Sequence, residues 1–114
     1  MVDGVRFQIN GVITCNTTGC VYRITCRKCK EFVYYGETGR ALKKRFWEHK
    51  NDILNFRAKA VPEHFNLPGH ALDDLIFVGI ERVLPTHDAF LRKQRESFYI
   101  CKARAVEEGA NRRR

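Results

Sequence analysis

The stretch that decides the fold of this chain is 33–49, which reads VYYGETGRALKKRFWEH. Its β-branched and aromatic beginning favours a strand, and Tyr35 and Gly36 predict a turn directly before a basic helix. In that helix Arg45 and His49 lie one turn apart. The sequence therefore predicts a strand that leads into a helix carrying two polar groups on one side.

Apolar residues recur at helical spacing over 40–56, after the start signal of Thr38 and Gly39. The apolar positions are Leu42, Phe46, Ile53 and Phe56. Arg45 and His49 fall along the edge of this stripe and not on the opposite face of the helix. Because burying a polar group costs free energy unless the group is paired, we expect both side chains to have partners beside the core.

The remaining elements follow from the same patterns of alternation and helical spacing. Runs of β-branched and aromatic residues at 21–25 and 32–36, separated by a cysteine knuckle at 26–30, predict an antiparallel hairpin. Residues 5–19 read as a short strand or arm that ends in a turn. Downstream we expect a short helix over 60–67, a strand over 75–83 and a final helix that ends near residue 105.

In this interpretation the final helix is capped by residues 86–88 and turns one apolar face to the core. The apolar face consists of Phe90, Leu91, Phe98 and Cys101. Glu96 falls on the other side of the helix. Periodicity alone does not decide whether that side faces solvent or a cleft.

Length and composition predict a single domain. A chain of 114 residues has room for one compact core, and 44% hydrophobic with 30% charged residues is ordinary for a globular protein. We expect the folded domain over 20–111, with an N-terminal arm at 1–19 and a basic tail at 112–114.

The charge balance favours a polyanionic partner. Twenty-one Lys and Arg against thirteen Asp and Glu give a net charge of +8. Charge alone is equally compatible with a basic surface that only keeps the protein soluble.

Cysteine usage predicts a reducing, intracellular setting. The five cysteines are an odd number, and the first residues lack the apolar run of a signal peptide. No segment approaches the roughly 20 apolar residues of a membrane-spanning helix, so we expect no membrane partner. In that setting Cys26-x-x-Cys29 indicates metal ligation or redox chemistry before it indicates a disulfide.

The order of the polar residues along the chain resembles the GIY-YIG nuclease family. That family has an aromatic GIY-type strand, a YIG-type strand, an Arg-x-x-x-His helix, a helical glutamate and a final asparagine, in this order. The matching positions are Tyr22, Tyr34 with Tyr35 and Gly36, Arg45, His49, Glu96 and Asn111. Cys20 replaces the glycine of the first triplet, and Tyr35 replaces the isoleucine or valine of the second.

The resemblance implies a small α/β domain of the α+β kind, with a three-stranded antiparallel sheet flanked by helices. It also implies a metal-dependent DNA endonuclease that hydrolyses phosphodiester bonds. Glu96 would hold a single Mg²⁺ (or Mn²⁺), because a hard cation prefers carboxylate and water oxygens. Arg45 would clamp the phosphate bidentately.

The other roles implied by the resemblance concern the water and the DNA. Tyr22, Tyr34 and His49 would line the approach of the attacking water, and the choice of general base among them stays open. Asn111 would orient the site. The expected contacts to the DNA backbone are Arg40, Lys43, Lys44 and Lys50.

A second group of residues predicts a zinc site. Cys26, Cys29, His64 and His70 supply four soft or borderline ligands, which suit a tetrahedral zinc ion, although their spacing alone leaves the site open. Among GIY-YIG domains, those attached to Penelope-like retroelements resemble this chain in having two cysteines between the triplet strands and two histidines downstream. The stretches VYYGETGR and EHFNLPGH are also similar to that subgroup. The likeness implies a structural Zn²⁺, nicking of target DNA for a retroelement, a fused or partner reverse transcriptase and a nuclear location.

Two other functions stay open from the sequence. Taken alone, each motif residue has a structural explanation, such as strand packing for the tyrosines or a surface ion pair for Glu96. The chain would then be a catalytically inactive, zinc-bearing module that binds nucleic acid. A Cys-x-x-Cys redox protein is the third candidate, although no βαβ unit surrounds the motif.

Overall fold

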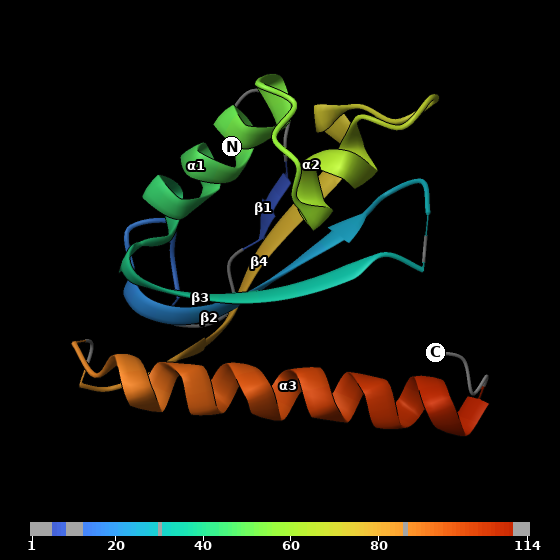
Figure 1. Cartoon of the computed structure of the whole chain (residues 1–114). Helices are drawn as coiled ribbons and strands as arrows, with labels where there is room; N and C mark the ends of the chain where they lie inside the picture. Colours follow the sequence, from blue (N-terminus) through green and yellow to red (C-terminus); the bar gives the residue numbers. More distant parts are fainter. Residues whose placement is uncertain (1–5, 9–12, 30, 86, 111–114) are drawn as a thin grey trace.

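The computed structural model describes residues 6–8, 13–29, 31–85 and 87–110, with side chains over 13–29, 31–85 and 87–104. One sheet carries helices on both faces (Figure 1). Helices α1 and α2 lie on one face, and the long helix α3 runs along the other. The elements are β1 (Arg6–Gln8), β2 (Thr18–Cys26), β3 (Val33–Ala41), α1 (Leu42–Leu54), α2 (Ala60–Phe65), the short 3₁₀ helix η1 (Leu72–Asp74), β4 (Leu75–Arg82) and α3 (Ala89–Ala110).

The strands are ordered β1-β4-β2-β3, and β2 is antiparallel to both β3 and β4. This confirms the predicted α+β fold, in which helices flank a three-stranded antiparallel sheet. The short strand β1 adds a fourth strand, parallel to β4, and Ile13 is buried in the core. The sheet and its core therefore begin within the segment that we expected to be an arm at 1–19.

The hydrophobic core lies between the sheet and the two helices α1 and α2. Alternate residues of β2, namely Cys20, Tyr22 and Ile24, are fully buried on this face, as strand geometry requires. The Tyr22 ring stacks on Phe77 of β4 with centroids 4.8 Å apart. The face of β2 that carries the first motif tyrosine is thus the core face.

The turn predicted at Tyr35 and Gly36 is wrong, because β3 continues through both residues to Ala41. Gly36 lies opposite Tyr22 in the β2–β3 ladder, which satisfies the backbone groups that a turn would leave unpaired. Thr38 and Gly39 likewise belong to the strand. Helix α1 begins only after them, at Leu42.

Helix α1 buries three of its four predicted apolar residues, Leu42, Phe46 and Ile53. The fourth, Phe56, lies beyond the helix end, has a φ of 53° and is 75% exposed. His49 is buried with the apolar residues, and Arg45 is half-buried beside them. The two polar groups therefore lie at the edge of the core, as the spacing of the apolar residues in the helix predicts.

Helix α3 does not bury the face that its apolar residues predicted. Phe90, Phe98 and Cys101 are exposed, whereas Arg92 is buried. Two arginines of α3 face the strands instead, because each pairs with a strand carboxylate. Arg92 pairs with Glu37, and Arg95 pairs with Glu81. The predicted cap is present, since Asp88 Oδ1 accepts a hydrogen bond from the amide of Leu91 at 3.0 Å.

None of the described helices combines the length and the apolar composition that a bilayer-spanning helix needs.

Candidate functional site

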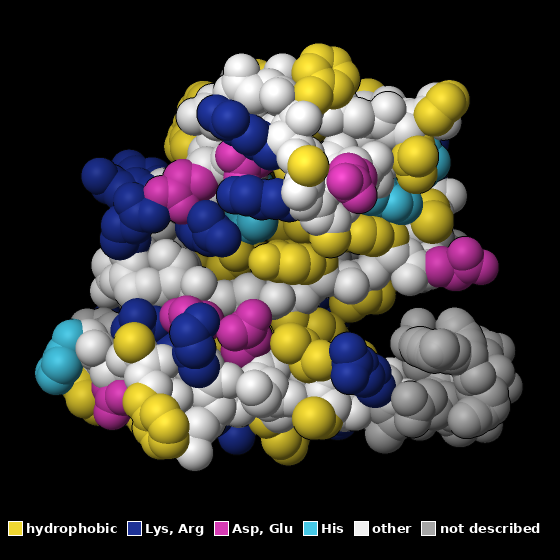
Figure 2. All heavy atoms as spheres, viewed as in Figure 1, with side chains coloured by type: hydrophobic (Ala, Val, Ile, Leu, Met, Phe, Trp, Pro, Cys, Tyr) yellow, Lys and Arg dark blue, Asp and Glu magenta, His cyan; other side chains and the backbone are white. Residues whose placement is uncertain are grey.

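Four of the six predicted active-site residues line one cleft of about 160 Å³. Tyr22 comes from β2, Tyr34 from β3, Arg45 from α1 and Glu96 from α3. The cleft thus opens beside the edge strand β3, between Arg45 from the helix on one face of the sheet and Glu96 from the helix on the other. Figure 2 shows charged side chains gathered on this side of the molecule, from α1 above the sheet to α3 below it.

The hydroxyl of Tyr22 is the centre of a buried hydrogen-bond network. Its oxygen lies 2.7 Å from Nε2 of His49, and Nε of Arg45 donates to the same oxygen at 3.0 Å. Because a guanidinium can only donate, the hydrogen of the phenol is available to His49, and Nε2 accepts it in the tautomer that carries the imidazole hydrogen on Nδ1. These are the partners that the sequence led us to expect for Arg45 and His49.

Gly36 makes room for this network. A Cβ at this position would overlap the ring of Tyr22, which lies directly across the ladder. The glycine is therefore required by the close approach of an aromatic ring rather than by a turn.

Burial is the largest influence on the ionisation of Tyr22 and His49. It raises the pKa of Tyr22 well above its usual value, with the charge of Arg45 acting in the opposite direction. It lowers the pKa of His49 to about 4, and here the charge of Arg45 adds to the effect. At neutral pH the pair is an uncharged phenol that donates to an uncharged imidazole.

Arg45 is held by contacts on two sides. Its Nη1 atom donates to Glu48 at 2.7 Å, while its Nε atom contacts Tyr22. Glu48 also pairs with Arg40, one of the predicted DNA contacts. The guanidinium plane of Arg45 is thus fixed at the cleft before any ligand binds.

The other predicted DNA contacts lie on α1. Lys43 and Lys44 are exposed, and Nζ of Lys50 lies 4.1 Å from the centroid of the Trp47 ring.

Tyr34, the second motif tyrosine, contacts the His49 ring edge-on, with ring centroids 5.8 Å apart.

Glu96 projects into the cleft from α3 and is partly buried. Burial raises its pKa; the neighbouring Lys93 opposes this and Glu37 adds to it. Among the described residues, no side chain donates a hydrogen bond to the Glu96 carboxylate. Its oxygens are therefore available to a cation in the cleft.

Sequence reasoning missed two residues of the cleft, Glu37 and Lys93. Glu37 accepts a hydrogen bond from Arg92 Nε at 2.7 Å and pairs with Lys93 at 3.0 Å. Glu37 directly follows the second triplet, and Lys93 lies three residues before Glu96, so both could have been found from their neighbours. Asn111, the last predicted residue of the site, lies outside the described residues.

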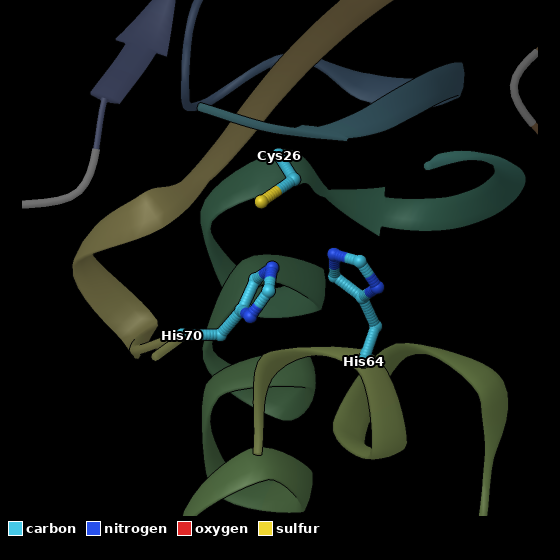
Figure 3. A group of neighbouring side chains, drawn as sticks. All are labelled: Cys26, His64 and His70. Carbon is cyan, nitrogen blue, oxygen red and sulfur yellow. The ribbon is translucent and has the colours of Figure 1, made fainter. Parts of the chain in front are cut away.

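Three of the four predicted zinc ligands form a separate group that could hold a metal ion. Ligand atoms of Cys26, His64 and His70 all lie within 4.8 Å of one another. Figure 3 shows the sulfur and the two rings pointing toward one another from the end of β2, from α2 and from the segment before β4. Cys29 is not in this group; it is partly buried and packs against the hydrophobic core.

The histidines of this group have the features of metal ligands. Both Nε2 atoms are buried without a hydrogen-bond partner in the described part of the chain, which costs free energy unless something else pairs with them. Nδ1 of His70 lies 3.4 Å from the carbonyl oxygen of Pro68, a contact that would leave the Nε2 lone pair free for a metal. Thiolate and imidazole ligands in this arrangement fit a metal ion.

Comparisons with protein-family models, with curated proteins and with solved structures gave no match to this chain. Functional conclusions therefore depend on the geometry of the two sites and on the motifs that form them.

Proposed function

We propose that this protein is a metal-dependent DNA endonuclease of the GIY-YIG type, which hydrolyses phosphodiester bonds and nicks one strand at a time. The observation that supports this is the shared cleft of Tyr22, Tyr34, Arg45 and Glu96, with His49 bonded to Tyr22. Two strands and two helices contribute these residues. Side chains with unrelated structural roles would have no reason to meet in one polar cleft at the sheet edge.

Arg45 and Lys93 would receive the scissile phosphate. Arg45 already points into the cleft with its plane fixed by Tyr22 and Glu48, so little conformational freedom is lost when a phosphate binds. The exposed Lys43 and Lys44 would contact the DNA backbone beyond the cleft, which extends the basic surface along α1.

Tyr22 and His49 would act together on the attacking water. The raised pKa of Tyr22 makes a standing tyrosinate unfavourable, so the phenol needs an acceptor for its own proton. His49 Nε2 is 2.7 Å away and uncharged. Tyr22 would take the proton of the water while its hydrogen passes to His49. The oxygen of the water then bonds to phosphorus as the bond from phosphorus to the 3′ oxygen breaks.

The cleft fits a hard divalent cation, because the Glu96 carboxylate faces polar neighbours and accepts no hydrogen bond from another described side chain. Mg²⁺ or Mn²⁺ bound there would neutralise charge on the phosphate and on the departing 3′ oxygen. Glu37 would hold Lys93 in the cleft, since its carboxylate is already paired with Lys93 and Arg92.

We assign a structural role and zinc to the second metal group. Cys26, His64 and His70 supply three ligands, and Cys29, three residues after Cys26, is the proposed fourth. Cys26 ends the strand that carries Tyr22, so a metal here would tie the His64–His70 segment to that strand. By the likeness of this ligand set to Penelope-like elements, the nicked DNA would be the target of a retroelement, in the nucleus, with a fused or partner reverse transcriptase.

Supercoiled plasmid provides the test of the proposed activity. Incubation with the purified protein and Mg²⁺ should convert plasmid to the open-circular form, and EDTA should stop the conversion. A gel shift without nicking, at any Mg²⁺ or Mn²⁺ concentration, would contradict the nuclease and indicate a module that only binds nucleic acid.

A further inference from the structure

A second, larger cleft of about 490 Å³ lies between the sheet and the C-terminal half of the described part of α3. Its lining includes Arg23, Val33, Tyr35, Ile80, Tyr99 and Lys102. In Figure 1 this half of α3 runs beneath the β2–β3 hairpin. None of these residues belongs to the nuclease site or to the metal group, and a cleft of this size matches small-ligand sites in other proteins.

The walls of this cleft suit a flat aromatic ligand. The rings of Tyr35 and Tyr99 are nearly parallel, with an interplanar angle of 18° and centroids 6.0 Å apart. Tyr99 is fixed by a hydrogen bond of 2.8 Å to Glu81. Val33 and Ile80 add apolar surface beside the rings. Such a surface offers one aromatic face against which a planar ring can stack.

Among the described side chains, the cations of the cleft have no acidic partner. Nε of Arg23 is buried and has no hydrogen-bond partner among the described residues, and neither Arg23 nor Lys102 forms an ion pair with a described side chain. A buried donor without a partner is unfavourable, so an anionic ligand would remove that cost.

We infer that this cleft binds one unpaired nucleotide of a single-stranded nucleic-acid segment, with the base against Tyr35 and the phosphate at Arg23 and Lys102. Bases in a duplex do not expose their faces, whereas unpaired bases stack on aromatic side chains without regard to sequence. The inference rests on the proposed function in taking nucleic acid as the partner. Tyr99 lies three residues beyond Glu96, about 4.5 Å along the helix axis, so a strand leaving the nuclease cleft could reach it.

The test is the affinity for a labelled oligothymidylate of about eight nucleotides, measured by fluorescence anisotropy in buffer without added Mg²⁺ or Mn²⁺, so that cleavage plays no part and the structural zinc stays bound. Tyr35→Ala and Arg23→Gln should each weaken this affinity by about 10-fold or more, and Tyr35→Phe, which keeps the ring, should retain it. The affinity of each variant for a duplex of the same length should stay within about two-fold of the affinity of the parent protein. Phe90→Ala, an exposed aromatic at the other end of α3, and Arg57→Gln, an exposed cation after α1, are the matched controls.

Thermal melting by circular dichroism should accompany each variant. If Tyr35→Ala fails to fold, the result for Arg23→Gln decides the test. This second variant replaces the guanidinium by an uncharged amide. Parent affinity in the folded Arg23 variant, or an equal loss for single-stranded and duplex DNA, would overturn the inference. So would free thymidine monophosphate competing as well as the oligonucleotide. Because these measurements contain no added Mg²⁺ or Mn²⁺, they can succeed even when no nicking is found, which separates this inference from the proposed function.

Discussion

The hydroxyl oxygen of Tyr22 lies 2.7 Å from Nε2 of His49 and accepts a hydrogen bond from Arg45 at 3.0 Å. Tyr22 belongs to the first motif strand, and the other two residues belong to the helix after the second. One buried oxygen thus connects the two halves of the motif, and it offers a path for a proton from the cleft to the imidazole.

Replacing Tyr22 with phenylalanine should lower the single-turnover nicking rate by about 10²- to 10⁴-fold, because the ring remains but the proton path is lost. His49→Gln in the same background should cause little further loss, since two residues of one path act as a unit. Nicking of supercoiled plasmid under excess enzyme measures both. A Tyr22→Phe rate equal to that of the parent would place the general base elsewhere.

Arg45→Lys should not behave as a conservative substitution. Lysine keeps the charge but cannot contact Tyr22 and Glu48 while presenting a planar fork to phosphate, so turnover should fall on the order of 10²-fold. Arg57→Lys, at an exposed position after α1, is the control and should match the parent. Turnover of the Arg45 variant within about three-fold of the parent would mean that Arg45 is only a surface cation.

Stability should depend on pH through His49. Its folded pKa of about 4 lies below the ordinary value of 6.5, so the unfolded chain takes up the proton first as the pH falls. The contribution is complete above pH 6.5 and is lost progressively down to about pH 4, amounting to roughly 3 kcal/mol. Urea unfolding of the parent and of His49→Gln across this range should show a shallower pH dependence in the variant. Equal slopes in the parent and in the His49 variant would show that His49 is not buried in its neutral form.

Losing the cysteine ligand should lower stability and metal content together. We expect the purified parent to hold about one equivalent of zinc, and Cys26→Ser to lose the zinc and melt at a lower temperature, because metal binding is coupled to folding. Cys101→Ser, at an exposed cysteine of α3, should change neither property. Inductively coupled plasma mass spectrometry with thermal melting tests this. A parent without zinc, or an unchanged melting temperature in Cys26→Ser, would rule out the structural site.

The role of Cys29 requires a separate variant, because the described structure brings only three ligands together. If Cys29 is the fourth ligand, Cys29→Ser should lose zinc as Cys26→Ser does. Retention of zinc in Cys29→Ser would leave a site of three protein ligands and contradict the four-ligand assignment.

The sequence was sufficient for the core face of the domain and insufficient for α3. Phe46 and His49 could be placed because helical spacing reports burial on the α1 side of the sheet. Helix α3 follows another rule: its strand-facing side is polar, because Arg92 and Arg95 pair with carboxylates on β3 and β4. Such pairs depend on residues far apart in the sequence, which periodicity does not detect.

Close tertiary contacts also determine features of the site that local sequence patterns do not predict. Local propensity predicts a turn at Gly36, whereas the structure places this residue in a strand opposite the ring of Tyr22. The position of Glu37 directly after the second triplet points to it, but its pairing with Arg92 and Lys93 of α3 can only be seen in the folded chain. The orphaned Nε2 atoms of His64 and His70, in turn, could only be seen once the chain was folded.

The most direct test of the central claim is Mg²⁺-dependent nicking by Glu96→Gln, measured beside its DNA affinity in buffer without added Mg²⁺ or Mn²⁺. The substitution removes one negative charge from the cleft and leaves the cations of α1 in place, so nicking should disappear while affinity stays near that of the parent. Glu31→Gln, at an exposed glutamate of the hairpin turn, controls for the change in charge and should nick normally. Undiminished nicking by a folded Glu96→Gln protein would contradict the assignment of this cleft as a nuclease active site.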